Sequence, residues 1–412
     1  MTGSHPPYPP SELELGELQP VSLGRWVAVW VSFAAGVAAA ASQNQIPPMA
    51  SLLQSFLQIS PTVMGFIMSS FGIAGAVLGI PVGVLTGGKS AKKLAMVGLA
   101  ALALGNSVPL AYLNPAGLVL GRIIGGVGFA LVAVAAPSIV SASAPPDRRG
   151  LAMGLWAAWV PAGTITIFNL TPWLVQALSV KGVWAFCVIL SLVALLAVSF
   201  LVVEPSRRSN PSASPPANAF GRASSDRRRV NLKLIYLSLA FWLFAATTLS
   251  VTTWLPTFLV QVRSLPLATA NFFGSLASAA AIAGCPTAGW LYDRYRSIRA
   301  ICCTGSAIQT ALFQLVFHLP TPVVPAIQLM TGFVGSMVPT VIFAAIPQLA
   351  RDKREVPLGL GLTLTAQNGG LIVGPTLTGW LLTATGSWDL VALAISLVCF
   401  VTAVMWLILP TE

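Results

Sequence analysis

Runs of about 20 consecutive apolar residues recur between residues 25 and 409, and they limit the possible folds more than any other feature. A helix of about 20 residues crosses a hydrocarbon core of roughly 30 Å with its backbone hydrogen bonds satisfied internally. Only 8% of the residues are charged, which excludes an ordinary soluble domain. The runs also lack the alternating segments of about ten residues that mark a transmembrane β-barrel. The sequence therefore predicts an all-α integral membrane protein.

The apolar runs predict twelve transmembrane helices. These cover residues 25–57, 61–85, 94–113, 116–143, 150–177, 182–203, 232–260, 267–291, 299–319, 321–349, 356–384 and 387–409. The first run is longer than a bilayer requires. Within it, Ile46-Pro47-Pro48 predicts a break, because proline lacks a backbone donor and clashes with the preceding turn. Residues 1–24 are rich in Pro and Glu and do not resemble a signal peptide, so they predict a disordered cytosolic tail.

The distribution of basic residues predicts the orientation. With the N-terminus inside the cell, cytoplasmic loops and span ends hold 19 of the 22 Lys and Arg residues, all except Arg122, Lys181 and Arg263. This excess places both termini in the cytoplasm of a multi-pass protein of the inner (plasma) membrane. Residues 204–231 predict a basic cytosolic linker between six-helix units at 25–203 and 232–409. Because orientation explains the net charge of +11, a nucleic-acid partner is not expected.

A short turn motif occurs twice, half a chain apart. Residues 83–93 (GVLTGGKSAKK) and 289–299 (GWLYDRYRSIR) each follow an apolar run and end in basic residues, 289 minus 83 or 206 residues apart. The spacing indicates two related halves. The repeat and the twelve spans together resemble the major facilitator superfamily, whose turn reads roughly G-x-L-x-D-R-x-x-x-R. The second copy fits this pattern well, whereas Gly87 stands in the first copy where the family has aspartate.

The resemblance implies two pseudo-symmetric six-helix bundles that alternate access by a rocker-switch motion. In this family the aspartate of the turn latches it to neighbouring helix ends, and a glycine-proline motif in span 11 lines the seam between the halves. Small residues at every fourth position also allow close helix packing. The conformational-gating residues expected on these grounds are Gly83, Gly289, Asp293, Arg294, Gly374 and Pro375.

Polar residues inside spans are costly in lipid and usually face protein or water. The predicted substrate-binding residues are Gln43 and Asn44 in span 1, Arg122 in span 4, Trp159 and Asn169 in span 5, and Gln367 and Asn368 in span 11. For Trp159 an interfacial anchor is the alternative, because tryptophan gathers at membrane surfaces.

Arg122 is the one basic residue predicted inside a span. Its guanidinium group suits the geometry of a carboxylate, which indicates an anionic substrate. It also lies only about five residues from the outer end of span 4, so it could instead snorkel or bond the carbonyls of neighbouring helices. The sequence leaves the ligand role and the structural role both open.

All eleven Asp and Glu residues lie in tails, loops or span ends, so no carboxylate is predicted inside the bundle as a proton carrier. Proton coupling and facilitated diffusion therefore both stay open. The five cysteines have no spacing typical of metal ligands, and no metal or cofactor is expected.

No cluster of catalytic residues gathers at one face, so the chain is not expected to be an enzyme. The leading hypothesis is secondary active or facilitative transport of a small solute, preferably an organic or inorganic anion because of Arg122. The alternative is efflux of lipophilic drug-like compounds. The expected partners are a small-molecule substrate and the lipid bilayer, and the protein is expected to be a monomer.

Overall fold

The computed structural model describes residues 19–85, 90–145, 148–203, 231–351 and 355–409. For residues 19–23, 78–85 and 357 it describes the backbone alone. In these ranges the chain forms helices joined by short loops and no strand. The predicted linker and most of the predicted N-terminal tail lie outside the described residues, although the first helix already begins at Gln19.

The described residues of the first half form eight α-helices and the short 3₁₀ helix η2. They are α1 (Gln19–Asn44), η2 (Pro47–Met49), α2 (Ala50–Leu57), α3 (Pro61–Leu85), α4 (Ala91–Ala111), α5 (Pro115–Ser143), α6 (Arg149–Ala157), α7 (Trp159–Leu178) and α8 (Lys181–Leu201).

The described residues of the second half form seven α-helices and one 3₁₀ helix. They are α9 (Leu232–Gln261), α10 (Leu267–Tyr295), α11 (Ile298–His318), η4 (Thr321–Val323), α12 (Val324–Gly335), α13 (Met337–Leu349), α14 (Val356–Thr385) and α15 (Trp388–Ile408).

The predicted break in the first span is confirmed, and its position follows from the prolines. Helix α1 ends at Asn44, and η2 begins at Pro47. In a continuing helix, the carbonyl groups of Gln43 and Asn44 would accept the N–H groups of residues 47 and 48. Both of those residues are proline and have no N–H group. The chain therefore bends here and continues as η2 and α2.

Two other spans were predicted as continuous helices, and the structure divides each of them. The span at 149–178 is interrupted after Ala157, and the span at 324–349 is interrupted after Gly335. Each break falls four residues before a proline, Pro161 or Pro339, which cannot donate to the carbonyl at that position. The same loss of a backbone donor that accompanies the first break is thus present at these two.

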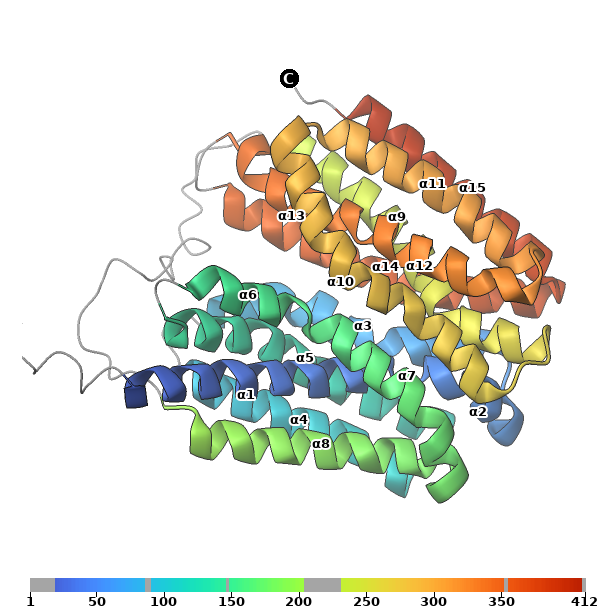
Figure 1. The fold of residues 1–412 in the computed structure, drawn as a ribbon. Helices are drawn as coiled ribbons and strands as arrows, with labels where there is room; N and C mark the ends of the chain where they lie inside the picture. Colours follow the sequence, from blue (N-terminus) through green and yellow to red (C-terminus); the bar gives the residue numbers. More distant parts are fainter. Residues whose placement is uncertain (1–18, 86–89, 146–147, 204–230, 352–354, 410–412) are drawn as a thin grey trace, which may run out of the picture.

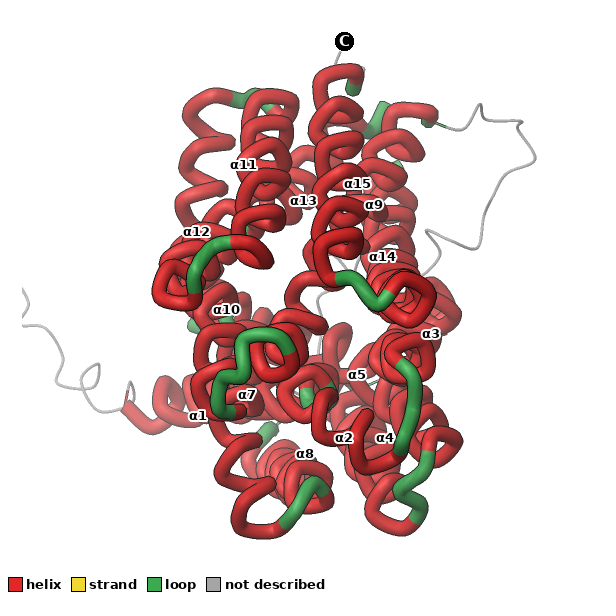
Figure 2. The backbone as a smooth tube through the Cα atoms, turned by 90° about the vertical axis from the view of Figure 1, so that its right-hand side faces the viewer, coloured by secondary structure: helices red, strands yellow, loops and turns green. Residues whose placement is uncertain are grey.

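The helices form two bundles, one from each half of the chain. In Figure 1, helices α1 to α8 form the lower bundle and α9 to α15 form the upper bundle. The bundles meet around α2 and diverge toward α6 and α13, and Figure 2 shows them stacked when viewed from the α2 end. We call the α2 end the far side. The opposite end, where α8 ends at Leu201 and α9 begins at Leu232, is the linker side.

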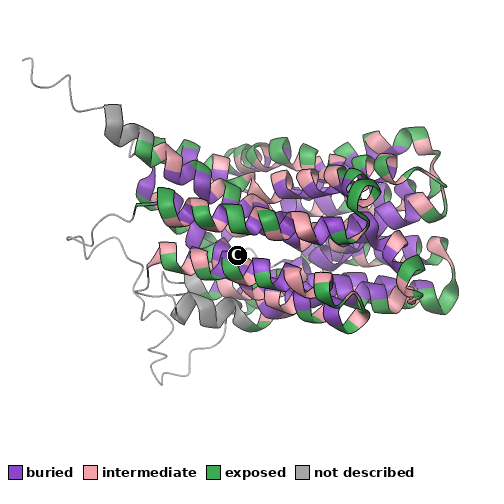
Figure 3. Ribbon diagram, turned by 90° about the horizontal axis from the view of Figure 1, so that it is seen from below, coloured by how far each residue is buried: buried purple, intermediate pink, exposed green. Residues whose placement is uncertain are grey.

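Ten spans in the described part of the chain are long and apolar enough to cross a membrane. Helices α3 and α14, with 25 and 30 residues, complete the predicted arrangement of twelve. Large apolar side chains are exposed on the outside of the bundles, for example Leu393, Leu397 and Phe400 on α15. Buried and exposed positions alternate along the helices in Figure 3. The chain is thus a multi-pass membrane protein.

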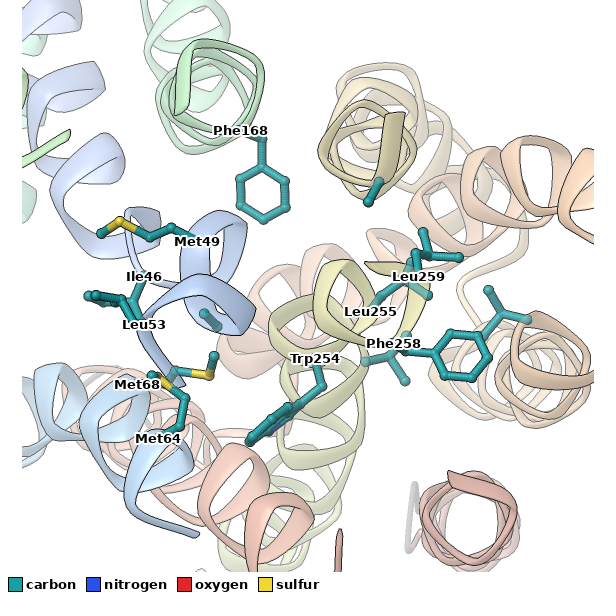
Figure 4. Packing of buried hydrophobic residues seen from close by; sticks show 14 of the residues in the cluster. Ile46, Met49, Leu53, Met64, Met68, Phe168, Trp254, Leu255, Phe258 and Leu259 are labelled. Carbon is teal, nitrogen blue, oxygen red and sulfur yellow. The ribbon is translucent and has the colours of Figure 1, made fainter. Parts of the chain in front are cut away.

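The hydrophobic cores differ between the two sides. On the far side, one continuous core joins both halves: Ile46 and Met49 of the first half pack in the same cluster as Leu255 and Phe258 of α9 (Figure 4). On the linker side, one core contains residues of α1, α4, α5, α6 and α8 alone. A separate core contains residues of α9, α10, α11, α13 and α15 alone. The two halves are therefore held together by a shared core on the far side only.

Candidate functional site

Arg122 of α5 is buried in the first bundle, with 4% of its surface exposed. Its Nη1 donates to the carbonyl oxygens of Ser42 (3.0 Å) and Gln43 (2.7 Å) at the end of α1. Its Nη2 donates to the carbonyl oxygen of Met68 in α3 (3.0 Å). The guanidinium group also lies 4.4 Å from the ring centre of Phe71. All of these partners are neutral, so none of them cancels the positive charge.

The end of α1 explains why Arg122 finds acceptors there. The Gln43 carbonyl has lost its helical donor to Pro47, and Arg122 supplies a replacement. The carbonyl end of a helix also carries partial negative charge, which favours a cation. Among the described residues no carboxylate forms an ion pair with Arg122. In this conformation Arg122 therefore has the structural role that the sequence left open, which is to bond carbonyl groups of neighbouring helices.

A buried polar network surrounds the same helix end. The side chain of Gln45 donates to Asn106 of α4 (2.9 Å), and Asn106 donates to the hydroxyl group of Ser42 (2.9 Å). That hydroxyl donates in turn to the carbonyl oxygen of Ala38 (2.9 Å). The network fixes the bend of α1 against α4. Asn106 was not among the residues predicted from the sequence. Its position as an amide side chain within an apolar run could have identified it.

Glycines of α5 allow Arg122 to reach α1 and α3. A side chain at Gly126 would meet the backbone of Phe71, and one at Gly128 would meet the backbone of Gly98 in α4. Gly126 and Gly128 therefore set how closely α3 and α4 approach α5.

A row of aromatic rings leads from Arg122 toward the linker side. Phe71 meets Phe129 with ring centres 5.5 Å apart, and Phe129 meets Trp159 at 5.3 Å. Trp159 stacks on Trp156 at 5.0 Å, with the ring planes 15° apart. Phe129 and Trp159 are partly exposed, whereas Trp156 is buried. Phe129 lies seven residues after Arg122 on one face of α5, a spacing that could have identified it from sequence.

Three of the predicted asparagines share one orientation. Asn44, Asn169 and Asn368 each donate from Nδ2 to the backbone carbonyl four residues earlier, at 3.0, 2.8 and 3.0 Å. Asn44 donates in addition to Thr164 of α7. Asn169 donates to Ser275 of α10, across the two halves. With their N–H groups used in this way, the side chains keep Oδ1 as an acceptor.

The predicted substrate residues do not form one compact group. Gln43 and Arg122 are joined through the Gln43 carbonyl, and Asn44 follows directly. Asn368 lies on α14, where Gly75 of α3 leaves room for its side chain. Gln367 is exposed on the same helix, next to Asn368. The structure thus distributes these side chains over both faces of the seam between the halves.

Side-chain hydrogen bonds cross from one half to the other at the far side. The hydroxyl groups of Thr62 and Thr383 are 2.8 Å apart, and those of Ser69 and Thr376 are 2.9 Å apart. Gln261 donates to Gln54 (3.1 Å), and Asn271 donates to the carbonyl of Pro48 (3.0 Å). All of these groups are uncharged, so the far-side contact is held without ion pairs among the described residues.

The predicted gating residues divide between the two sides. Gly374 packs against the carbonyl of Ala246 in α9, and the carbonyl of Pro375 accepts from the Trp254 indole (3.0 Å). These contacts fix the path of α14 along the seam.

On the linker side, Asp293 and Arg294 are exposed at the end of α10, and open space surrounds Gly289. Gly83 lies in the stretch of α3 where only the backbone is described, and Gly87 lies outside the described residues.

Within the described residues, no group of three or more His, Cys, Asp or Glu side chains could hold a metal ion. What the arrangement offers is hydrogen bonding, stacking and one buried positive charge. These properties suit reversible binding of a solute.

Comparisons with known proteins agree with this arrangement. A family model described as the Major Facilitator Superfamily matches residues 31–330. The chain is 24% identical over 372 residues to the protein named probable anion transporter 6, chloroplastic, of Arabidopsis thaliana, covering 84% of this chain and 72% of that protein. It is 22% identical over 378 residues to a hexuronate transporter of Bacillus subtilis (strain 168), covering 87% and 88%.

Solved structures show the same fold. A bacterial homologue of the human lysosomal transporter Spinster, in an inward-facing and unoccupied conformation, aligns with a TM-score of 0.73 at 15% identity, covering 95% of this chain and 96% of that one. The nucleoside transporter NupG also aligns with a TM-score of 0.73 at 15% identity, covering 93% and 100%.

Proposed function

Because the chain belongs to the Major Facilitator Superfamily and is a transporter of small solutes rather than an enzyme, we propose that it carries a hydroxylated organic anion such as a sugar acid. Two relatives support an anion by their names, one an anion transporter and the other a hexuronate transporter. Neither name supports the alternative of lipophilic drug efflux.

The observation that carries the proposal is the uncompensated charge of Arg122. A charge inside a membrane bundle acts over a longer range than in water, because the surroundings have a low dielectric constant. The carbonyl groups of Ser42, Gln43 and Met68 stabilise the guanidinium group but leave its net charge in place. An anion beside Gln43 and Asn44 would be attracted by this charge without displacing Arg122 from α1.

The three oriented asparagines support a hydroxylated substrate. Their Oδ1 atoms accept hydrogen bonds, so they suit a solute that carries O–H donors. A fully ionised inorganic anion offers acceptors only and would gain little from them. A sugar acid combines a carboxylate for the field of Arg122 with hydroxyl groups for these oxygens. Its ring could also stack on the partly exposed Trp159.

The transport cycle follows from the two sides of the molecule. With the linker side in the cytoplasm, as the basic residues indicate, this conformation is inward-facing, because the shared core closes the far side. We expect rocking of the halves to open the far side and bring the linker-side surfaces together, with Gly289, Asp293 and Arg294 at that contact. A coupled proton and a monomeric assembly stay predictions.

A thermal-shift experiment with three solutes tests the substrate class. Glucuronate and glucose differ mainly in one carboxylate, and phosphate supplies negative charge without hydroxylated carbon. A ligand that binds the folded state raises its melting temperature by mass action. We expect glucuronate to stabilise the purified protein, and glucose and phosphate to have much smaller effects. Equal stabilisation by glucose would contradict the role of the charge.

Variants of two arginines separate binding from folding. Arg263 also donates to carbonyl groups at a helix end, those of Phe317 and Leu319, and lies over Phe258. Arg263→Gln therefore removes a comparable structural contact away from the proposed site. We expect Arg122→Gln to abolish the glucuronate shift and uptake into proteoliposomes, and Arg263→Gln to keep both. If folded Arg122→Gln still transports glucuronate like the parent, the proposal is wrong.

A further inference from the structure

An apolar pocket of about 370 Å³ lies between α9, α14 and α15 of the second half. Its lining includes Leu243 and Ala246 of α9, Val373 and Leu377 of α14, and Ala394 and Val398 of α15. None of the predicted substrate-binding residues contributes to it. The pocket is therefore separate from the proposed transport site.

The hydroxyl groups in the pocket wall have their donors satisfied within their own helices. Thr247 donates to the carbonyl of Phe244 (2.9 Å), and Ser250 donates to that of Ala246 (2.7 Å). Thr378 donates to the carbonyl of Gly374 (2.9 Å). No charged residue lines the pocket. The lining is otherwise almost entirely apolar, so a polar solute would lose its hydration here and gain few partners. The pocket therefore suits a hydrocarbon.

The position and shape of the pocket limit the choice of hydrocarbon. Leu377 and Trp380 in its wall are 57% and 56% exposed, and on a membrane-spanning helix such faces meet lipid. Along α9 the lining runs from Trp242 to Ser250, about 12 Å at 1.5 Å per residue. The pocket is thus elongated along the helices, which is also the direction of lipid chains in a bilayer.

We propose that this pocket binds one acyl chain of a membrane phospholipid. An empty pocket of this size would deprive its walls of van der Waals partners, and lipid chains are the abundant hydrocarbon at that depth. The acyl chain packs between α14 and α15, against the side of α9 that lines the pocket. Because Gly374 of α14 contacts α9 there, the bound chain supports the helix that forms the seam with α3.

Photo-crosslinking in proteoliposomes tests this site. The probe is a phosphatidylcholine with a diazirine group in the middle of one acyl chain, and labelled peptides are located by mass spectrometry. We expect labelling to concentrate on the pocket residues of α14 and α15. Ala394→Phe places a ring in the pocket and is expected to lower this labelling at least fivefold. Ala307→Phe, on an exposed position of α11 outside the pocket, is the matched control and should leave it unchanged.

Other outcomes would overturn the proposal. Labelling spread evenly over the lipid-facing helices would mean that lipid passes the pocket without binding. If Ala394→Phe is labelled as strongly as the parent protein, the acyl chain binds outside this pocket. Crosslinks between two protein copies through α14 and α15 would show that protein covers the pocket. If Ala394→Phe fails to fold, Val373→Phe fills the same space from α14 and is judged by the same labelling.

Discussion

Glycines on the two sides of the molecule meet different surroundings. On the far side, a side chain at Gly65 would strike the carbonyl of Pro375, and one at Gly379 would strike the carbonyl of Pro61, in each case in the opposite half. On the linker side, nothing lies within 4 Å of the corresponding position at Gly154 or Gly289. Glycine is thus essential to the contact between the halves at Gly65 and Gly379 and is unconstrained at Gly154 and Gly289.

The difference indicates that the glycines of this chain do not all serve the contacts of one conformation. The far-side glycines fit the contact that exists in this conformation, which is closed on the far side. The linker-side glycines have no such contact in this state, and in a rocking mechanism they become contact positions when the linker side closes.

The largest effect is expected from fixing the far side shut. Thr62→Cys with Thr383→Cys places two thiols where the hydroxyl groups are now 2.8 Å apart across the halves. Oxidation should link α3 to α14 and abolish uptake completely, because the far side can no longer open. Reduction should restore uptake. Each single cysteine variant under oxidant is the control for the native thiols, and uptake that survives a complete crosslink would disprove far-side opening.

Larger side chains at the linker-side glycines should slow transport without destabilising the conformation that is closed on the far side. Gly289→Val and Gly154→Val add side chains in open space, so the melting temperature of each variant should stay close to that of the parent. The opposite state would have to accommodate the added bulk, and we expect roughly tenfold slower uptake, equivalent to about 1.4 kcal/mol. Proteoliposome uptake and thermal unfolding measure the two effects. Parental uptake in both variants would remove these glycines from the mechanism.

Crowding a far-side glycine should have the opposite signature. Gly65→Ala forces a methyl group against the carbonyl of Pro375, and such overpacking costs about 1–3 kcal/mol. We expect a lower melting temperature and faster alkylation of a cysteine placed at Ser69 on the seam. Gly289→Ala is the matched control on the linker side. An unchanged melting temperature for Gly65→Ala would show that the far-side contact yields easily.

The smallest effect is expected from a single hydrogen bond across the seam. Thr376→Val removes the bond to Ser69 while keeping nearly the same shape. Hydrogen bonds between membrane helices contribute about 0.6 kcal/mol on average, so the melting temperature should fall only slightly. Thr363→Val, which removes a hydroxyl bonded within α14, provides the control. A large destabilisation would indicate that this bond supports the whole far-side contact.

Much of the fold was predictable because its causes are local. The apolar runs predicted the spans, and the prolines predicted the break after Asn44. The interruptions at Ala158 and Ser336 were not predicted, although each also lies before a proline. Prolines at 109, 137, 172, 256, 286, 347 and 375 lie inside helices that continue, so proline alone does not decide between a break and an intact helix.

The candidate site was only partly predictable because its partners are remote in sequence. The sequence identified Arg122, but its acceptors at Ser42, Gln43 and Met68 are backbone carbonyl groups 80, 79 and 54 residues away. Every residue has such a carbonyl, so no pattern of side chains marks these three. Phe71 was missed for the same reason, since its place over Arg122 depends on how α3 crosses α5.

The sequence by itself determined that this chain spans a membrane in two related halves, because hydrophobic length and repeated motifs require no knowledge of contacts. It also determined that any charge within the spans would come from a single arginine. Only the tertiary structure decided that Arg122 caps the end of α1, and that the shared core closes the far side while Gly154 and Gly289 lie open. Those properties depend on which helices meet, and in the rocking mechanism proposed above one sequence must satisfy two packings.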